Sequence, residues 1–190
     1  MGKVYVILAD GFEEVEALTV VDILRRGGVD VTTLSVMKDK KVCGAHGICV
    51  EADEVISSSL NIEETEMIIL PGGGKGRDNM AACKPLLDAL IQANERGVKI
   101  AAICAAPTVL GRIGLLKGIV SVCYPDPGLE AELKGRIAPS SDRRTITDGN
   151  ITTSMGPATA MEFALELLEI LKGEKMASLV AAGLLYKGQA

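Results

Sequence analysis

The stretch KIAAICAAPTVLGR, residues 99–112, decides the fold because it changes from a strand pattern to a helix pattern at one cysteine. Residues 98–103 are apolar and favour a buried strand. Residues 105–114 favour a helix with proline in its first turn, a position where proline is tolerated. Cys104 is therefore expected where a strand ends and a helix begins.

The same alternation extends on both sides of this stretch. Short β-branched runs alternate with longer helical patterns, which is typical of an α/β protein with a mostly parallel sheet covered by helices on both faces. Strands are predicted at residues 3–9, 29–36, 67–74 (running into a glycine turn), 98–103 and 119–123. Helices are predicted at residues 14–28, 84–97, 105–114, 158–173 and, as a short C-terminal helix, 174–188. β-Hairpin patterns with glycine lie at residues 38–57 and 144–154.

Composition limits the class of protein. A chain of 190 residues that is 48% hydrophobic suits a single compact domain over residues 1–190. The net charge of −5 and the lack of a long basic run argue against nucleic acid or an anionic membrane as a partner. The first residues lack the pattern of a signal peptide, and no apolar run is long enough to cross a bilayer. We therefore expect a cytoplasmic protein.

The cysteines and the histidine argue against a metal centre. The cysteines stand at residues 43, 49, 83, 104 and 123, which is an odd number without a C-x-x-C pair. His46 is the only histidine that could help to bind zinc. Neither a disulfide framework nor a metal site is therefore expected.

Three loop segments should meet at one edge of the sheet. The segments DGFEEVEA (10–17), LPGGGKGRDN (70–79) and ICAAP (103–107) each follow a predicted strand. The carboxyl ends of parallel strands lie together, and ligands bind at that edge. The side chains of these segments are therefore the first candidates for a functional site.

The surroundings of Cys104 favour a nucleophile. Small alanines around it permit a sharp turn similar to a nucleophile elbow, in which the next N–H group helps to hold an oxyanion. A helix N-terminus lowers the pKa of a thiol. Glycines 72–74 could direct a further N–H group at the same oxyanion. The alternatives are a buried structural thiol and a glycine turn without any chemical role.

Glu13, Glu14 and Glu16 stand at the start of the first predicted helix. Their simplest role is to complement the helix dipole, which favours carboxylates in a first turn. Three carboxylates exceed that need, so one of them could lie beside Cys104. Two adjacent anions would repel each other, so such a pair requires the carboxyl group to keep its proton and donate it to the thiolate as a hydrogen bond.

Taken together, five motifs resemble one known family. The motifs ADGFEEVEA, RRGG, LPGGG, AAICAAPTVL and TSMGPATAMEFALELLEIL occur in this order over nearly the whole chain. The chain is similar to the ThiJ/PfpI superfamily, in the branch of the Parkinson's-disease protein deglycase and its bacterial and protist relatives. The resemblance implies a flavodoxin-like sheet sandwiched by helices and a homodimer.

The resemblance also assigns roles to residues. It implies that Cys104 and Glu16 are catalytic and that the N–H groups of Gly73 and Ala105 hold the oxyanion. The implied dimer contact is the arginine pair after the first helix. The two arginines of this pair are Arg25 and Arg26. The neighbours implied for the site are Gly72, Tyr124, Gly156 and Pro157.

The sequence departs from the family at one position. Several members carry a histidine near the cysteine, where this chain has Tyr124, and His46 lies in a predicted hairpin. A Cys-His-Asp triad is therefore unsupported. Glu16 remains the candidate for proton transfer beside Cys104.

The resemblance implies glyoxalase III or protein deglycase chemistry on methylglyoxal or glyoxal adducts, without a metal or an organic cofactor. The substrate would be a small reactive aldehyde or a glycated group. One alternative is a redox sensor or holdase chaperone that acts through oxidation of Cys104. Two weaker alternatives are thiazole monophosphate biosynthesis, which no residue supports, and a PfpI-like protease. Such a protease carries histidine after the cysteine, where this chain has Ala105.

Overall fold

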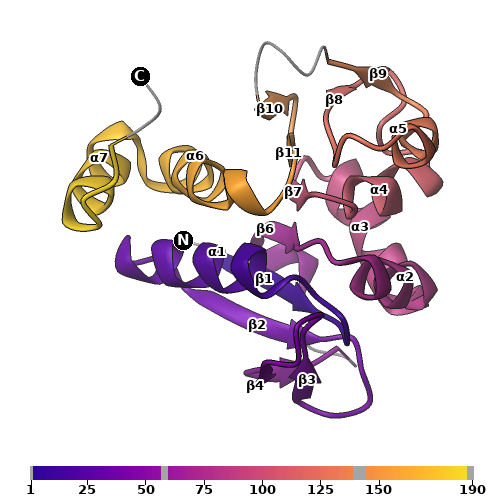
Figure 1. Cartoon of the computed structure of the whole chain (residues 1–190), viewed down its shortest axis with the longest axis horizontal. Helices are drawn as coiled ribbons and strands as arrows, with labels where there is room; N and C mark the ends of the chain where they lie inside the picture. The colour runs from indigo at the N-terminus through magenta and orange to yellow at the C-terminus, as the bar shows by residue number, and fades with distance from the viewer. Residues whose placement is uncertain (1, 57–59, 139–143, 188–190) are drawn as a thin grey trace.

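A seven-stranded sheet forms the centre of the computed structural model, which describes residues 2–56, 60–138 and 144–187 (Figure 1). Its strands are β1 (Lys3–Leu8), β2 (Val31–Ser35), β5 (Glu54–Val55), β6 (Thr65–Leu70), β7 (Lys99–Ile103), β10 (Thr145–Asp148) and β11 (Ile151–Ser154). Their order across the sheet is β10-β11-β7-β6-β1-β2-β5. Neighbouring strands are parallel except β10, which is antiparallel to β11.

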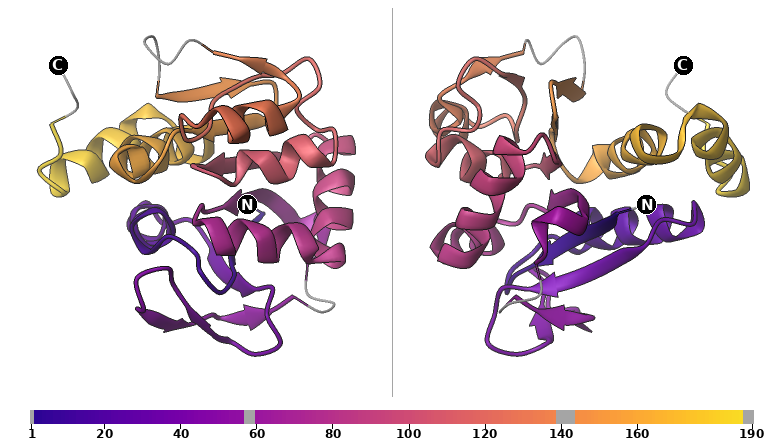
Figure 2. Two further views of the ribbon diagram at one scale, coloured as in Figure 1. Left: turned by 45° about the vertical axis from the view of Figure 1, so that its right-hand side comes forward. Right: turned by 180° about the vertical axis from the view of Figure 1, so that it is seen from behind.

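Helices cover both faces of this sheet (Figures 1 and 2). The helices on one face are α1 (Glu14–Arg26), α6 (Ala160–Lys172) and α7 (Glu174–Gly183). Those on the other face are α2 (Gly74–Ala82), α3 (Lys84–Glu95), α4 (Pro107–Arg112) and α5 (Pro127–Leu133). Two single-turn 3-10 helices, η1 (Ile62–Glu64) and η2 (Pro157–Thr159), precede β6 and α6.

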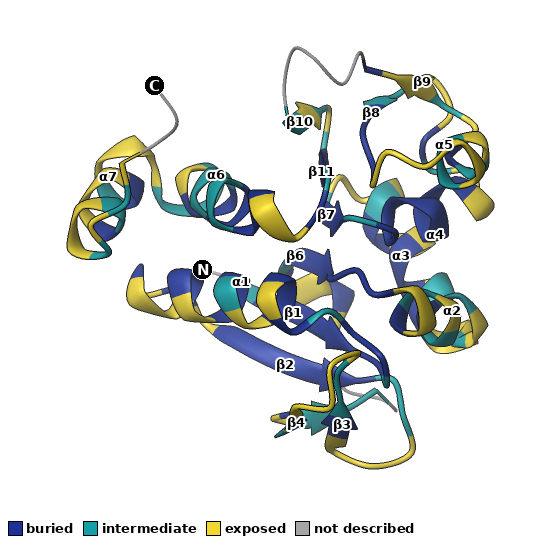
Figure 3. Cartoon of the chain, in the orientation of Figure 1, coloured by how far each residue is buried: buried dark blue, intermediate teal, exposed yellow. Residues whose placement is uncertain are grey.

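The alternation of side chains along β1 explains why two apolar cores form. Tyr5 and Ile7 belong to the core beneath α3 and α4, whereas Val4 and Val6 belong to the core beneath α1 and α6. Successive residues of a strand point to opposite faces, so a strand covered on both sides must be apolar throughout. Figure 3 shows the resulting pattern, with buried residues along the central strands and on the helix sides that face them.

The predicted fold class is confirmed. Both predicted hairpins are present, one as β3 (Lys41–Cys43) with β4 (Cys49–Glu51) and the other as β10 with β11. The predicted C-terminal helix corresponds to α7, although its predicted end at residue 188 lies outside the described residues. The extent of the domain, residues 1–190, stays a prediction.

Two elements differ from the prediction. In the segment 119–123, β8 (Val120–Ser121) pairs with β9 (Arg136–Ile137) in a separate small sheet, because β11 occupies the place beside β7. Helix α2 was not predicted, since its glycines have a low helix propensity. Contacts with the rest of the fold stabilise it: Met80 is buried, and the Asn79 side chain donates to the Asp10 carbonyl at 2.8 Å.

The cysteine pattern predicted no disulfide framework, and one disulfide corrects this prediction. It joins Cys43 and Cys49. They are directly opposed residues of the antiparallel pair β3–β4, an arrangement that brings their side chains together. Cys83, Cys104 and Cys123 are free.

Over residues 2–56, 60–138 and 144–187, none of the helices combines the length and the apolar character needed to span a bilayer. The cytoplasmic location stays a prediction.

Candidate active site

Cys104 lies in a tight turn directly after β7. Its backbone has φ +63°, which is the left-handed region that residues other than glycine rarely adopt. The Cys104 N–H donates to the Ser154 carbonyl and the Cys104 carbonyl accepts from the Tyr124 N–H, each at 2.9 Å. These bonds hold the strained turn in place. The helix begins at Pro107, so the prediction that it starts at the residue after Cys104 is wrong by two positions.

Glu16 reaches Cys104 from the buried face of α1. It precedes the buried residues Val20 and Leu24 by four and eight positions, so all three share one side of the helix. The Glu16 side chain is fully buried, and its Oε2 accepts from the Gly72 N–H at 2.7 Å. The other oxygen, Oε1, is buried without a hydrogen-bond partner among the described residues.

Gly72 shows how closely the thiol and the carboxyl group approach each other. A Cβ atom at Gly72 would lie 2.5 Å from Cys104 Cβ and 2.5 Å from Glu16 Oε2. Both side chains therefore contact the same glycine, and only a residue without a side chain fits between them. The structure thus brings Glu16 and Cys104 together from two segments that are far apart in the sequence.

The backbone N–H groups of Gly73 and Ala105 are directed at the Cys104 sulfur and act to lower the pKa of its thiol. They belong to the two residues that the family resemblance implied as oxyanion donors. Gly73 has φ +93°, and a Cβ atom there would lie 2.2 Å from the Gly11 carbonyl oxygen. Glycine is therefore required for the turn that directs this N–H group.

Burial shifts the pKa values of the pair. It raises the pKa of the Glu16 carboxyl group to about 7, although hydrogen bonds with Gly72 and Cys104 oppose the shift. Burial and then the charge of Glu16 raise the pKa of the Cys104 thiol to about 12, against the N–H groups of Ala105 and Gly73. The predicted lowering of the thiol pKa is therefore wrong, because burial and the carboxylate outweigh the backbone donors. Between the two values the pair shares one proton and one negative charge.

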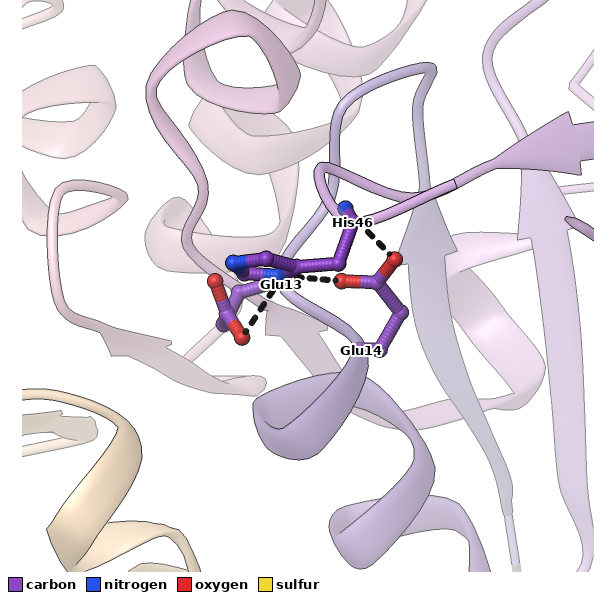
Figure 4. A group of neighbouring side chains, drawn as sticks. All are labelled: Glu13, Glu14 and His46. Atoms are coloured by element: carbon purple, nitrogen blue, oxygen red, sulfur yellow. Dashed lines mark hydrogen bonds and ion pairs between the residues drawn. The ribbon is translucent and has the colours of Figure 1, made fainter. Parts of the chain in front are cut away.

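The three glutamates at the start of α1 have different partners. Glu14 is buried, and its Oε1 accepts from the backbone N–H groups of His46 at 2.8 Å and Ile48 at 3.3 Å. Its Oε2 lies 2.9 Å from His46 Nδ1, and Glu13 Oε1 lies 3.6 Å from the same nitrogen (Figure 4). Glu14 thus fastens the turn between β3 and β4, whereas Glu16 contacts Cys104. Complementing the helix dipole is therefore not the common role of the three.

This cluster has the composition of a metal site but is already hydrogen-bonded. Glu13, Glu14 and His46 each place one ligand atom within 4.8 Å of the others. Both Glu14 oxygens are engaged by the turn, and the ring nitrogen nearest to them is engaged by Glu14. Burial would raise the pKa of Glu14, but the hydrogen bonds from His46 and Ile48 help to lower it to about 2. We assign no metal to the cluster.

Of the four predicted neighbours of the site, Gly72 contacts both Cys104 and Glu16, and the other three lie together. Tyr124 is joined to Cys104 through its backbone, and its ring covers Gly156, where a Cβ atom would lie 3.4 Å from Tyr124 Cδ2. Tyr124, Gly156 and Pro157 contribute to an apolar cavity of about 210 Å³. A larger groove of about 850 Å³ between α6 and α7 contains none of the predicted site residues.

The arginine pair is engaged within the chain. Arg25 forms an ion pair with Asp53 at 2.7 Å, and Arg26 forms one with Asp22 at 2.6 Å. The homodimer contact that the resemblance implies for them stays a prediction.

Sequence reasoning missed the hydrogen-bond partners of Glu14, and it missed the Cys43–Cys49 disulfide that closes the turn carrying these partners. The spacing of Cys43 and Cys49 around the turn GAHGI is the signal that could have revealed the disulfide, because it places both residues at the base of a hairpin. No comparable signal points from Glu14 to His46, since their contact depends on how the hairpin folds over α1.

Comparisons with known proteins identify the family of this chain. Residues 2–170 match the model of the DJ-1/PfpI family. Protein DJ-1 homolog B of Arabidopsis thaliana is 38% identical over 97% of this chain, and protein dj-1beta of Drosophila melanogaster is 36% identical over 95%. The match covers 95% of the Drosophila protein but 42% of the Arabidopsis protein, so the chain spans less than half of the latter.

A solved structure extends the likeness to three dimensions. The structure of oxidized DJ-1 from Toxoplasma gondii is 37% identical to this chain, with a TM-score of 0.87, and covers 98% of this chain and 99% of the other. A family match over most of the length, together with this shared fold, settles the classification. The chain belongs to the DJ-1/PfpI family.

Proposed function

We propose that this protein is a cofactor-independent glyoxalase or deglycase, in which Cys104 is the nucleophile and Glu16 carries the proton. The observation that supports this most strongly is the buried contact of the Cys104 thiol with the Glu16 carboxyl group, one oxygen of which has no hydrogen-bond partner within residues 2–56, 60–138 and 144–187. A thiol beside a group that exchanges protons near neutral pH is what addition to an aldehyde requires.

The reaction on methylglyoxal follows from this pair. The Cys104 thiol gives its proton to the Glu16 carboxylate, and the thiolate forms a C–S bond with the aldehyde carbon. The resulting oxyanion takes the proton from Glu16, with stabilisation by the N–H groups of Gly73 and Ala105. Glu16 then takes the proton of that carbon and returns it to the neighbouring carbon, while the hydroxyl proton passes to the oxygen of the neighbouring carbon, which leaves a lactoyl thioester. Water hydrolyses the thioester, so methylglyoxal and water give lactate and the free thiol.

The experiment that tests this proposal measures lactate formation while Cys104 is alkylated in steps. We expect turnover to fall in proportion to the alkylated fraction of Cys104, determined by peptide mapping, because the thiol forms the covalent intermediate. Cys83→Ala is the matched control, since Cys83 is a free, half-buried thiol outside the site. Full turnover after complete alkylation of Cys104 would refute the nucleophile.

The same experiment separates the second candidate, a redox sensor. The structural relative from Toxoplasma gondii was solved in an oxidized state, and Glu16 stands where it could hydrogen-bond an oxidised Cys104. One stoichiometric oxidation of Cys104 by dilute peroxide, without any lactate formation, would favour sensing over catalysis.

A further inference from the structure

The Cys43–Cys49 disulfide lies at the surface of the molecule, outside the Cys104 site. It joins opposed residues at the base of a turn, with Cys49 exposed and Cys43 half-buried. An exposed disulfide is open to attack by a thiolate, and exposed disulfides belong to the labile class that exchanges with small thiols. Its position thus differs from that of a structural disulfide buried in a core.

A charged cavity adjoins the half-buried cysteine. Its volume is about 350 Å³, and its lining includes Cys43, Asp10 and Lys75. Lys75 is exposed, and across the described part of the chain no carboxylate lies within ion-pair distance of its ammonium group. Asp10 Oδ1 accepts from the Cys43 N–H at 3.0 Å, which fixes its carboxylate beside the disulfide. The cavity therefore presents one cation and one anion next to a disulfide.

These charges match one chemical class of thiol. A small thiol that carries carboxylate and ammonium groups can pair its carboxylate with Lys75 and its ammonium group with Asp10. We propose that Cys43–Cys49 is a redox site that exchanges with small zwitterionic thiols bound against Lys75, and that its redox state controls how firmly the turn is held on Glu14. This site is separate from the proposed function of Cys104 and does not depend on it.

The exchange balances with two thiol molecules. The thiolate of the first attacks one sulfur of the disulfide, forms a mixed disulfide and releases the other cysteine as a thiolate, which takes up the proton. The thiolate of a second small thiol attacks the mixed disulfide at the sulfur of the first small thiol, which releases the protein cysteine as a thiolate that takes up a proton. The small thiols leave as their own disulfide, and Cys43 and Cys49 both become thiols. The small disulfide re-oxidises the protein by the reverse steps.

The disulfide closes a ring around the turn that binds Glu14. The backbone N–H groups of His46 and Ile48, which both lie within this ring, donate to Glu14 Oε1. Opening the disulfide removes the covalent constraint on the turn, so these bonds become easier to break. The hydrogen bond to Glu14 raises the pKa of His46 in the closed form, aided by the charges of Glu13 and Glu14. His46 is the only histidine of the chain, so its ring resonance reports on the turn without assignment of other signals.

The test measures how fast the full-length oxidised protein is reduced by glutathione and by the uncharged thiol 2-mercaptoethanol. Rates are expressed per thiolate, and alkylation with peptide mapping follows Cys43 and Cys49. Glutathione should react about three- to fivefold faster, the range expected from one exposed ion pair. Lys75→Gln should remove this preference. Lys117→Gln is the matched control, because it removes an exposed lysine that does not line the cavity and should keep the preference.

The histidine signal tests the second part of the proposal. On reduction, the pKa of His46 measured by NMR should fall toward its ordinary value, and the double variant Cys43→Ser, Cys49→Ser should show the lower value without any reductant. Equal rates with the two thiols, a preference that survives Lys75→Gln, or a histidine titration unchanged by reduction would overturn the proposal. So would failure of glutathione disulfide to close the Cys43–Cys49 bond.

Discussion

Glu16→Gln should make the protein more stable at pH 8 by about 3 kcal/mol and lower its turnover of methylglyoxal by about 100-fold or more. The pKa of this carboxyl group rises from 4.5 to about 7 on folding, mainly because of burial. Ionised Glu16 therefore destabilises the folded chain. Glutamine stays neutral, and its carbonyl oxygen can still accept from the Gly72 N–H group. It cannot take and return a proton.

The sign of the pH dependence gives the prediction a second check. Below about pH 4.5 the carboxyl group is protonated in the folded and unfolded chains, so the variant and the wild type should have similar stability there. As the pH rises toward 7, the unfolded chain has lost its proton while folded Glu16 still holds one, so the wild type loses stability relative to the variant. Urea unfolding at several pH values measures the difference.

Glu13→Gln is the matched control for this prediction. Glu13 belongs to the same acidic run but contacts His46 instead of Cys104. Its replacement should leave turnover within about threefold of the wild type. If Glu13→Gln abolished turnover and Glu16→Gln preserved it, the proton carrier would be a different carboxylate from the one proposed here.

Gly72→Ala should lower turnover by about 100-fold or more through a single added methyl group. The Cβ atom would lie 2.5 Å from both Cys104 Cβ and Glu16 Oε2, so the two side chains must move apart. The cost in stability should be about 1–3 kcal/mol, which is typical of overfilling a tight contact. Steady-state kinetics and thermal unfolding of the purified variant measure both effects.

The neighbouring glycine supplies the control. A Cβ atom at Gly74 would meet nothing within 4 Å, so Gly74→Ala should keep full turnover and leave the stability unchanged or raised by up to about 1 kcal/mol. Equal turnover in Gly72→Ala and Gly74→Ala would show that close contact of the thiol and the carboxyl group is not needed for the reaction.

The elements that surround the site could be predicted from the sequence because their patterns are local. The apolar run before Cys104, the proline after it and the glycines at 72–74 identify strand, helix and turn without any knowledge of distant contacts. The meeting of these segments followed from one general property, that parallel strands end at a common edge. Glu16 could be chosen over its two acidic neighbours only through the family resemblance.

Features that depend on distant contacts could not be predicted in this way. Helix α2 forms from a glycine-rich segment because the rest of the fold holds Met80 and Asn79. The direction of the shift in the Cys104 pKa depends on how deeply the thiol is buried and on the charge of Glu16, and sequence gives neither quantity. The Cys43–Cys49 disulfide depends on the register of a short hairpin, which no periodic pattern fixes.

The most direct test of the shared proton is the rate at which Cys104 is alkylated as a function of pH, in the wild type and in Glu16→Gln. While the pH is below the pKa of an isolated thiol, each increase of one pH unit raises the thiolate fraction, and with it the alkylation rate, by about tenfold. In the wild type, the rate should rise up to about pH 7, where the pair loses its first proton, and then stay level well past pH 9, the ordinary pKa of a thiol. In Glu16→Gln the plateau should be missing, and the rate should keep rising through pH 9 because burial still holds the thiol pKa above that value. The same profile for both proteins would contradict the pairing of Cys104 with Glu16.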